Sequence, residues 1–201
     1  MKIIGLTGSI GMGKSTAANT FRRLRIPVFD ADAAVHRLQS RGGAAVAPIE
    51  AAFPGTTRDG VVDREALRRR VLGDPAALTR LERIVHPLVR RAERAFLAAA
   101  RRRGDRLAVL DIPLLFETKG EGRVDEVIVV SAPAAVQRMR VLARGGMTEE
   151  RFRAILARQV PDAEKRRRAD HVVRTGLSRH AAQRRIRAIV RGMRALHSKA
   201  S

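Results

Sequence analysis

Residues 8–15 read Gly8-Ser9-Ile10-Gly11-Met12-Gly13-Lys14-Ser15, which matches the pattern G-x-x-x-x-G-K-[S/T] at every specified position. The apolar residues 2–7 before it are typical of a buried strand, and an amphipathic helix is expected from residue 14 to about residue 25. A strand, a glycine-rich turn and a helix in this order are the setting that such a loop requires. The stretch therefore predicts a phosphate-binding loop rather than a chance glycine turn.

Each residue type in this loop has a physical reason. Glycines permit positive φ and leave room for phosphate oxygens beside the backbone. Successive N–H groups then converge on a phosphate, and the start of the helix adds its partial positive charge. Lys14 is placed to bridge the β- and γ-phosphates, and the Ser15 hydroxyl to bind Mg²⁺. The residues expected to bind the nucleotide are Gly11, Met12, Gly13, Lys14, Ser15 and Thr16.

Further buried strands are expected at residues 27–29, 107–111, 126–131 and 171–174, with helices at about 134–144, 148–158 and 178–196. Near-continuous apolar strands alternating with helices indicate an α/β fold with one doubly wound parallel sheet. Residues 63–103 read as helical, with a break or kink expected at Pro87, just after His86. Ser178 suits an N-cap, and the basic end from about His197 is expected to fray.

Composition excludes several classes of protein. The 201 residues contain no cysteine, so disulfides, thiolate metal sites and thiol catalysis are ruled out. No apolar run approaches the roughly 18–20 residues that a membrane span needs, and no signal peptide is expected, so the predicted location is cytoplasmic.

The formal charge of +21 is large, and arginine supplies most of it. A basic surface attracts polyanions, including nucleic acid. Dispersed arginines on solvated helix faces are the simpler interpretation, and an aromatic content of 3% offers little for stacking bases. Nucleic acid is therefore not an expected partner.

Two carboxylates follow the second expected strand, Asp30 and Asp32. The carboxyl ends of parallel strands face the ligand crevice, so a carboxylate here could orient an attacking hydroxyl or accept its proton. One of the two could instead cap the next helix, because Asp is a favoured N-cap. The residues alone leave catalysis and capping equally open.

Other candidates carry similar alternatives. Asp111 after the third strand suits a water-mediated Mg²⁺ contact, or is a turn residue before Pro113. His86 either contacts a substrate or packs at a kink. Arg140 and Arg144 are four residues apart on one expected helix and could clamp a transferring phosphoryl group. A solvated helix face is the alternative that spacing alone favours in so arginine-rich a chain.

Several separated segments together resemble the dephospho-CoA kinase family, in that family's order and near its spacing. The run at residues 112–117, Ile-Pro-Leu-Leu-Phe-Glu, and the pair His86-Pro87 discriminate better than the phosphate loop does. The resemblance covers about residues 1–176. Its other segments are Asp30-Ala31-Asp32, Asp63-Arg64 with Leu67, Leu81-Glu82 with Ile84, Asp111, residues 140–144, Gln159 and Ala169-Asp170.

The resemblance implies a P-loop NTPase fold like that of nucleoside monophosphate kinases, with a five-stranded parallel sheet flanked by helices. It implies one kinase domain over residues 1–201. The core is expected at about 1–32, 104–135 and 168–197, a helical acceptor-binding region at about 33–103, and a lid at about 140–167.

The implied reaction transfers phosphate from ATP to the ribose 3′-hydroxyl of dephospho-CoA, which gives coenzyme A in the last step of its synthesis. Asp32 matches the base on that hydroxyl, and the other expected catalytic residues are Lys14 and Arg140. Arg144 is expected to bind the nucleotide and His86 the acceptor, while Ser15 and Asp111 are expected to hold Mg²⁺. A monomer or weak homo-oligomer is expected.

One position departs from the family pattern. Thr175 stands where the family usually has an Asn near the adenine of ATP, and Thr cannot offer the two-sided hydrogen bonding of an amide.

The rival hypotheses are another nucleoside or nucleotide kinase of the same fold and, from another class, a nucleic-acid-binding P-loop protein.

Overall fold

The computed structural model describes residues 1–198, with side chains through Ala195. The chain divides into two compact units. The first comprises Met1–Phe29 and the described residues from Ala100 onward, and the second comprises Asp30–Ala99. Each unit has its own hydrophobic core.

The first unit is built on a five-stranded sheet with the order β2-β5-β1-β6-β7. The pairings of β1 with β5 and β6, and of β6 with β7, are parallel. The predicted parallel α/β sheet is therefore confirmed. The strands are β1 (Lys2–Thr7), β2 (Val28–Asp30), β5 (Leu107–Asp111), β6 (Glu126–Ser131) and β7 (His171–Arg174).

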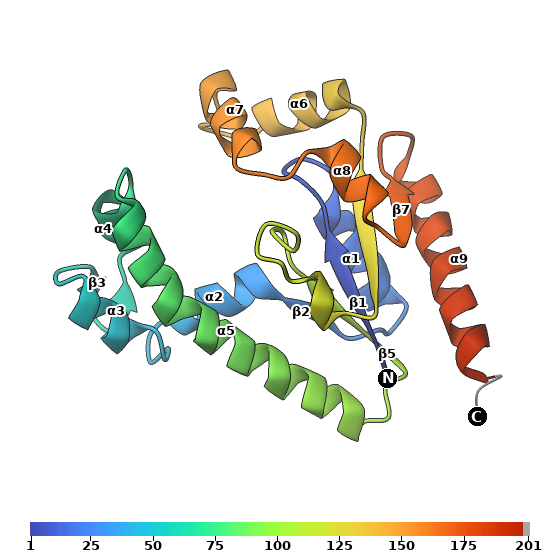
Figure 1. Cartoon of the computed structure of the whole chain (residues 1–201), viewed down its shortest axis with the longest axis horizontal. Coiled ribbons are helices and arrows are strands. Elements are labelled where there is room, and N and C mark those ends of the chain that lie inside the picture. The colour runs from blue at the N-terminus through green and yellow to red at the C-terminus, as the bar shows by residue number, and fades with distance from the viewer. Residues whose placement is uncertain (199–201) are drawn as a thin grey trace. The chain divides into compact units, whose positions relative to one another are not determined.

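Helices of the first unit cover this sheet (Figure 1). The prediction that Ser178 caps the last helix is confirmed, because its hydroxyl accepts a hydrogen bond of 3.0 Å from the Ala181 N–H. That helix runs to Ser198, so His197 is still helical, and residues 199–201, on which the rest of the expected fraying falls, lie outside the described part. The helices are α1 (Lys14–Arg23), α6 (Ala134–Leu142), α7 (Glu149–Ala157), α8 (Asp162–Arg167) and α9 (Arg179–Ser198), with a 3₁₀ turn at Glu121–Arg123.

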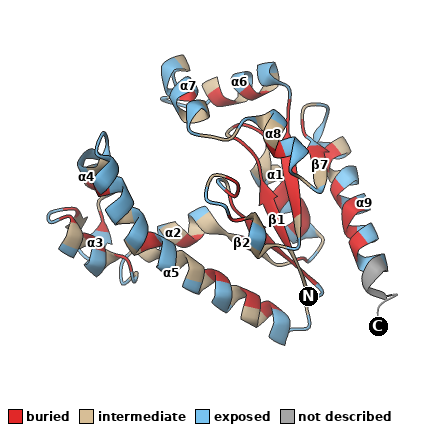
Figure 2. Ribbon diagram, in the orientation of Figure 1, coloured by how far each residue is buried: buried red, intermediate tan, exposed pale blue. Residues whose placement is uncertain are grey.

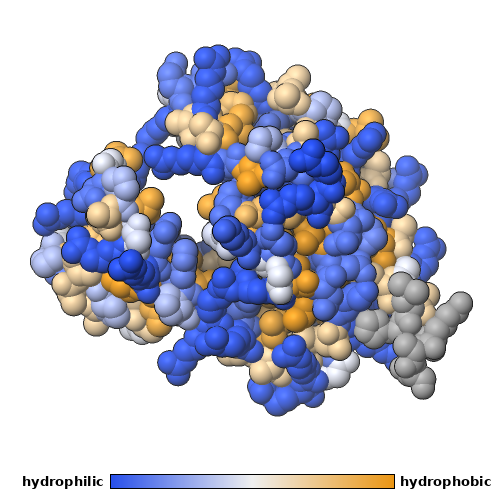
Figure 3. Space-filling model, in the orientation of Figure 1, coloured by the Kyte–Doolittle hydropathy of each residue, from blue (hydrophilic) through white to orange (hydrophobic). Residues whose placement is uncertain are grey.

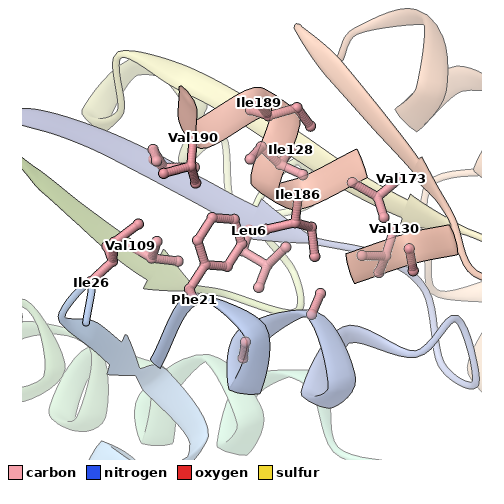
Figure 4. Packing of buried hydrophobic residues seen from close by; sticks show 14 of the residues in the cluster. Leu6, Phe21, Ile26, Val109, Ile128, Val130, Val173, Ile186, Ile189 and Val190 are labelled. Atoms are coloured by element: carbon pink, nitrogen blue, oxygen red, sulfur yellow. The ribbon is translucent and has the colours of Figure 1, made fainter. Parts of the chain in front are cut away.

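The core of the first unit lies between the sheet and the pair α1 and α9. Figure 4 shows Phe21 of α1 pointing among Leu6 of β1 and Ile186 of α9, and all three are fully buried. Strand residues alternate between faces, so Ile128 and Val130 join this cluster while Ser131 hydrogen-bonds α8 through Asp162. Both faces of the central strands are therefore covered, and β1 is buried along most of its length (Figure 2).

The second unit is mostly helical. Its elements are α2 (Ala31–Gln39), α3 (Val46–Ala52), the antiparallel pair β3 (Thr57–Arg58) and β4 (Val61–Val62), α4 (Arg64–Val71) and α5 (Pro75–Arg102). Ile49, Phe53 and Leu67 are at the centre of its core. The sequence had not resolved α2, α3 or the β3–β4 pair, because these elements are too short to show a clear apolar period.

The prediction of a break at Pro87 is wrong, because α5 runs through it as one helix. Proline removes one backbone hydrogen bond, which leaves the carbonyl of the residue four positions earlier, Arg83, without its usual partner. Both Arg83 and Pro87 are exposed, so water can satisfy that carbonyl. The remaining turns, which pack Val85, Leu88 and Val89 into the core of the unit, keep the helix intact.

Within residues 1–198, no helix is long and apolar enough to span a membrane. The face of the molecule drawn in Figure 3 is largely hydrophilic, as the dispersed arginines predict.

A charged cluster ties together the amino ends of three strands. Lys2 of β1 donates a hydrogen bond to the Glu126 carboxylate of β6, and His171 Nε2 of β7 lies 2.8 Å from the other oxygen of that carboxylate. Burial alone would raise the pKa of Glu126, but the hydrogen bonds with Lys2 and His171 together hold that pKa below its ordinary value. A carboxyl group with a lowered pKa stabilises the fold above its unfolded pKa, and the contribution is lost as pH falls through the lowered value.

We therefore expect Glu126→Gln to destabilise the protein at neutral pH and to matter progressively less below about pH 4, where the unfolded carboxyl protonates. Thermal unfolding of both proteins between neutral and acid pH measures this difference. The exposed Glu82→Gln serves as control and should leave the melting temperature unchanged at every pH. A melting-temperature difference for Glu126→Gln that does not shrink on acidification contradicts the assignment.

Candidate active site

The phosphate loop leaves the sheet at the carboxyl end of β1 and enters α1. Gly11 and Gly13 have φ of 78° and 84°, a region that side chains with a Cβ rarely adopt. A Cβ on Gly11 would also lie 2.5 Å from Val141 Cγ2 of α6. Gly13 is the N-cap of α1, which has no side-chain cap and no acidic residue in its first turn. The first N–H groups of α1 are therefore available to an anion.

Other parts of the first unit hold this loop in place. Met12 is 2% exposed, its carbonyl accepts the Thr175 hydroxyl at 2.7 Å, and its sulfur accepts the Ala132 N–H at 3.0 Å. The Ile10 carbonyl accepts Gln137 Nε2 at 2.7 Å, and the Ile10 N–H donates to Gln159 Oε1 at 3.2 Å. Residues from the segment after β6, from α6, from the segment after α7 and from the segment after β7 thus hold the loop.

Lys14 and Asp111 form an ion pair in the loop. Lys14 Nζ lies 2.6 Å from Asp111 Oδ1, and the two side chains are 18% and 4% exposed. Asp111 is the last residue of β5, next to β1 in the sheet, which places its carboxylate beside the loop. The position of Asp111 beside Lys14 is compatible with the predicted water-mediated Mg²⁺ contact, which stays a prediction.

Arg140 is oriented by the segment that follows β7. Its guanidinium donates to the Thr175 carbonyl at 2.8 Å and to the Thr175 hydroxyl at 3.2 Å. The expectation that Arg140 and Arg144 share a helix is wrong, because α6 ends at Leu142 with Ala143 as its C-cap. Glycines at 145 and 146 end the helical pattern soon after, so residue 144 lies beyond the last turn.

The loop and these arginines nevertheless line one cavity of about 350 Å³. Its polar lining combines loop N–H groups and hydroxyls with guanidinium groups, and the carboxylates lie outside its lining. Such a cavity suits a polyanion with an attached ring system, because Arg binds phosphate and also stacks on planar groups. The lining residues are Gly11, Gly13, Ser15, Thr16, Ala17, Thr20, Arg140, Arg144, Thr175, Ser178, Arg179, Ala182 and Ile186.

Three candidate residues belong to the second unit. Asp30 is the N-cap of α2, since its Oδ1 accepts the Ala33 N–H at 2.9 Å. Asp32 is exposed in the first turn of α2 and does not supply that cap. The capping role that the sequence left open therefore falls to Asp30. His86 is exposed on α5, which argues against a packing role.

No group of three or more His, Cys, Asp or Glu side chains within residues 1–198 could hold a metal ion by itself. A Mg²⁺ ion in such a site takes most of its ligands from phosphates and water, with one or two from the protein. The Ser15 hydroxyl is exposed at the start of α1 and meets that requirement.

Sequence reasoning missed several residues that shape the site. Gln137 and Arg179 carried no recognisable signal, and Gln159 entered only as part of a family pattern. Thr175 was noted for the amide that it replaces, but the structure shows a hydroxyl engaged with Met12 and Arg140. The pairing of residues so far apart along the chain has no local pattern that could reveal it.

The comparisons with known proteins agree on one family. Residues 2–188 match the family model described as dephospho-CoA kinase. A dephospho-CoA kinase from Mesorhizobium japonicum is 61% identical over 96% of this chain and 98% of its own length. One from Paramagnetospirillum magneticum is 68% identical over 83% of this chain and 78% of its own length.

Solved structures with a similar fold include two from other bacteria. TT1252 from Thermus thermophilus is 39% identical and superposes with a TM-score of 0.83 over 95% of this chain and 96% of that one. The dephospho-CoA kinase from Campylobacter jejuni, with a TM-score of 0.64 over 96% and 97% of the chains, is 22% identical and supports the fold alone.

We expect Thr175→Val to destabilise the protein by about 1–3 kcal/mol, because the buried Met12 carbonyl and the Arg140 guanidinium each lose a partner. Thr175→Ser retains the hydroxyl and should cost less. Urea unfolding of the three proteins measures the difference. Equal stability of the Val and Ser variants would contradict a role for the hydroxyl in holding the loop.

Proposed function

The chain belongs to the dephospho-CoA kinase family, and from this membership we propose that it phosphorylates the ribose 3′-hydroxyl of dephospho-CoA. ATP is the co-substrate, and the products are ADP and coenzyme A. The observation that carries the proposal is a phosphate loop held in place by Thr175, from which α1 starts without a side-chain cap and Lys14 points to the last residue of β5, Asp111. The proposed location is the cytoplasm and the proposed state a monomer or weak homo-oligomer.

The nucleotide is proposed to fill the cavity beside the loop. Its triphosphate lies against residues 11–16, and its base and ribose lie toward Arg140, Arg144 and Thr175. Because Thr175 already gives its hydroxyl to Met12, base recognition rests on stacking and on backbone groups rather than on this side chain. We therefore expect weaker discrimination among nucleobases than an Asn at this position would give.

Lys14 changes partners when ATP binds. The Lys14 ammonium group lies 2.6 Å from the Asp111 carboxylate, which balances its charge. The β- and γ-phosphates offer more negative charge at the same place, so the ammonium group moves to them and stabilises charge that grows during transfer. Asp111 and Ser15 would hold the Mg²⁺ ion, which when bound would neutralise phosphate charge.

The acceptor is proposed to bind in the region 33–103, with His86 as one contact. From its match to the family pattern, Asp32 is proposed to orient the 3′-oxygen and accept its proton, while Asp30 caps α2. Residues 140–167 form the proposed lid, whose closure would exclude water and limit hydrolysis of ATP. Arg140 belongs to both the lid and the nucleotide cavity, so it is suited to act on the transferring group.

The direct test incubates the purified chain with ATP, Mg²⁺ and dephospho-CoA and detects coenzyme A by mass. We expect coenzyme A to form, and Lys14→Ala to lower turnover at least about 100-fold because a charged group at the phosphates is lost. Parallel reactions with AMP, CMP and simple nucleosides control for another kinase of the same fold. Faster phosphorylation of any of these acceptors would overturn the proposed substrate.

Asp30 and Asp32 give a matched pair of variants. Asp32→Asn should lower turnover by roughly 10²–10⁴-fold with ATP affinity near normal, because the base is lost and the shape is kept. Asp30→Asn should stay close to the unmodified protein, since Asn caps a helix as well as Asp does. Turnover by steady-state kinetics and ATP affinity by calorimetry are the measurements. An active Asp32→Asn variant removes this residue from the mechanism.

A further inference from the structure

The first unit contains a second cavity, of about 590 Å³, that is distinct from the nucleotide cavity. The two cavities have no lining residue in common. Met12 lines the second cavity, whereas Gly11 and Gly13 line the nucleotide cavity. The two cavities therefore lie on opposite sides of the phosphate loop. The end of β7 and the segment after it separate the two cavities in the same way, with Arg174, Gly176 and Leu177 on one side and Thr175 on the other.

The walls of this cavity are mainly apolar. Most of the lining consists of small or apolar side chains: Met12, Ala132, Pro133, Ala134, Ala163 and Leu177. Leu177 is 81% exposed, the highest value among the large hydrophobic side chains described as exposed. A volume of this size, apolar walls and a few polar groups are the usual properties of a small-molecule site.

The polar groups of the cavity include two arginines. Arg174 is exposed and, within the described part of the chain, makes no ion pair, so it can bind an anionic group at no cost to the fold. Arg166 already pairs with Asp162 Oδ2 at 3.0 Å. A ligand for this cavity therefore needs a negative charge close to Arg174.

The Asp162 carboxylate is held by its neighbours at the edge of this cavity. Its Oδ2 is engaged by both Arg166 and the Ser131 hydroxyl, the latter at 2.7 Å. Its Oδ1 is buried and has no hydrogen-bond partner among the described residues. This oxygen has almost no accessible surface, so an occupant of the cavity does not contact it, and the polar contacts offered to a ligand come from the arginines.

We propose that this cavity is a second ligand site, for a small molecule with an aromatic or aliphatic body and one anionic group. Its occupant modulates the phosphate loop. Met12 and Gln137 line the cavity, and the same two residues hold the loop through the Met12 carbonyl and the Gln137–Ile10 hydrogen bond. Any change that the occupant makes in nucleotide affinity must be matched by an equal effect of nucleotide on the occupant.

A suitable probe is 8-anilinonaphthalene-1-sulfonate, which has aromatic rings, one sulfonate and one N–H. The chain has no Trp or Tyr, so Leu177→Trp introduces a single reporter at the cavity. We expect saturable binding, seen both as probe fluorescence and as a change in Trp emission. Arg174→Gln in this background should weaken binding about tenfold by removing the charged partner. Ala163→Phe should also weaken it, by filling the cavity from an exposed position.

The matched control is Arg184→Gln, the same change of charge at an exposed position on α9 outside both cavities. It should leave probe affinity unchanged. Equal loss of affinity for Arg184→Gln and Arg174→Gln would show attraction to the basic surface in general and would overturn the proposal.

Titration with ATP and Mg²⁺ distinguishes two sites from one. For two sites, probe affinity changes to a limiting value as ATP saturates. If the apparent dissociation constant of the probe instead keeps rising in proportion to ATP concentration, probe and nucleotide compete for one site. That result overturns the proposal. Both titrations report binding alone, so the result does not depend on whether the chain phosphorylates dephospho-CoA.

Discussion

The structure depends on the concentration of positive charge at the phosphate loop. Gly11 and Gly13 turn backbone N–H groups toward one place, α1 begins there without a cap, and Lys14 adds a full charge. Concentrated positive charge in a partly buried site repels itself unless something balances it. Asp111, 4% exposed and 2.6 Å from the Lys14 ammonium group, is that balance, and it stands at the end of the strand next to β1.

The same requirement explains why distant segments converge on the loop. A backbone rich in glycine loses much conformational entropy when it is fixed, so contacts from outside must hold it. Gln137 and Gln159 hold both backbone groups of Ile10, and Thr175 holds the carbonyl of Met12. Catalysis of phosphoryl transfer gains from this arrangement, because donors fixed in advance need not reorganise during the reaction.

A buried ion pair extends this support to α8. Lys165 has no exposed surface and lies 2.8 Å from Glu117, whose same oxygen accepts the Val160 N–H at 2.9 Å. Removing either charge would leave the other buried without a partner, which is strongly destabilising. The segment 159–165 is thereby attached to the connection after β5, close in the chain to Asp111. One end of the proposed lid is thus anchored to the elements that shape the loop.

The sequence by itself determined the five strands of the parallel sheet and the phosphate loop. Their signals are local: an apolar strand of six residues, glycines at fixed offsets, and a Lys-Ser pair opening a helix. The break expected at Pro87 is absent from α5, since the packing of the remaining turns outweighs one lost hydrogen bond. Only the tertiary structure decided that Asp30 caps α2, that Asp111 pairs with Lys14 and that Thr175 supports the loop. These contacts depend on which side chains the fold brings together, and the spacing of residues along the chain does not predict that.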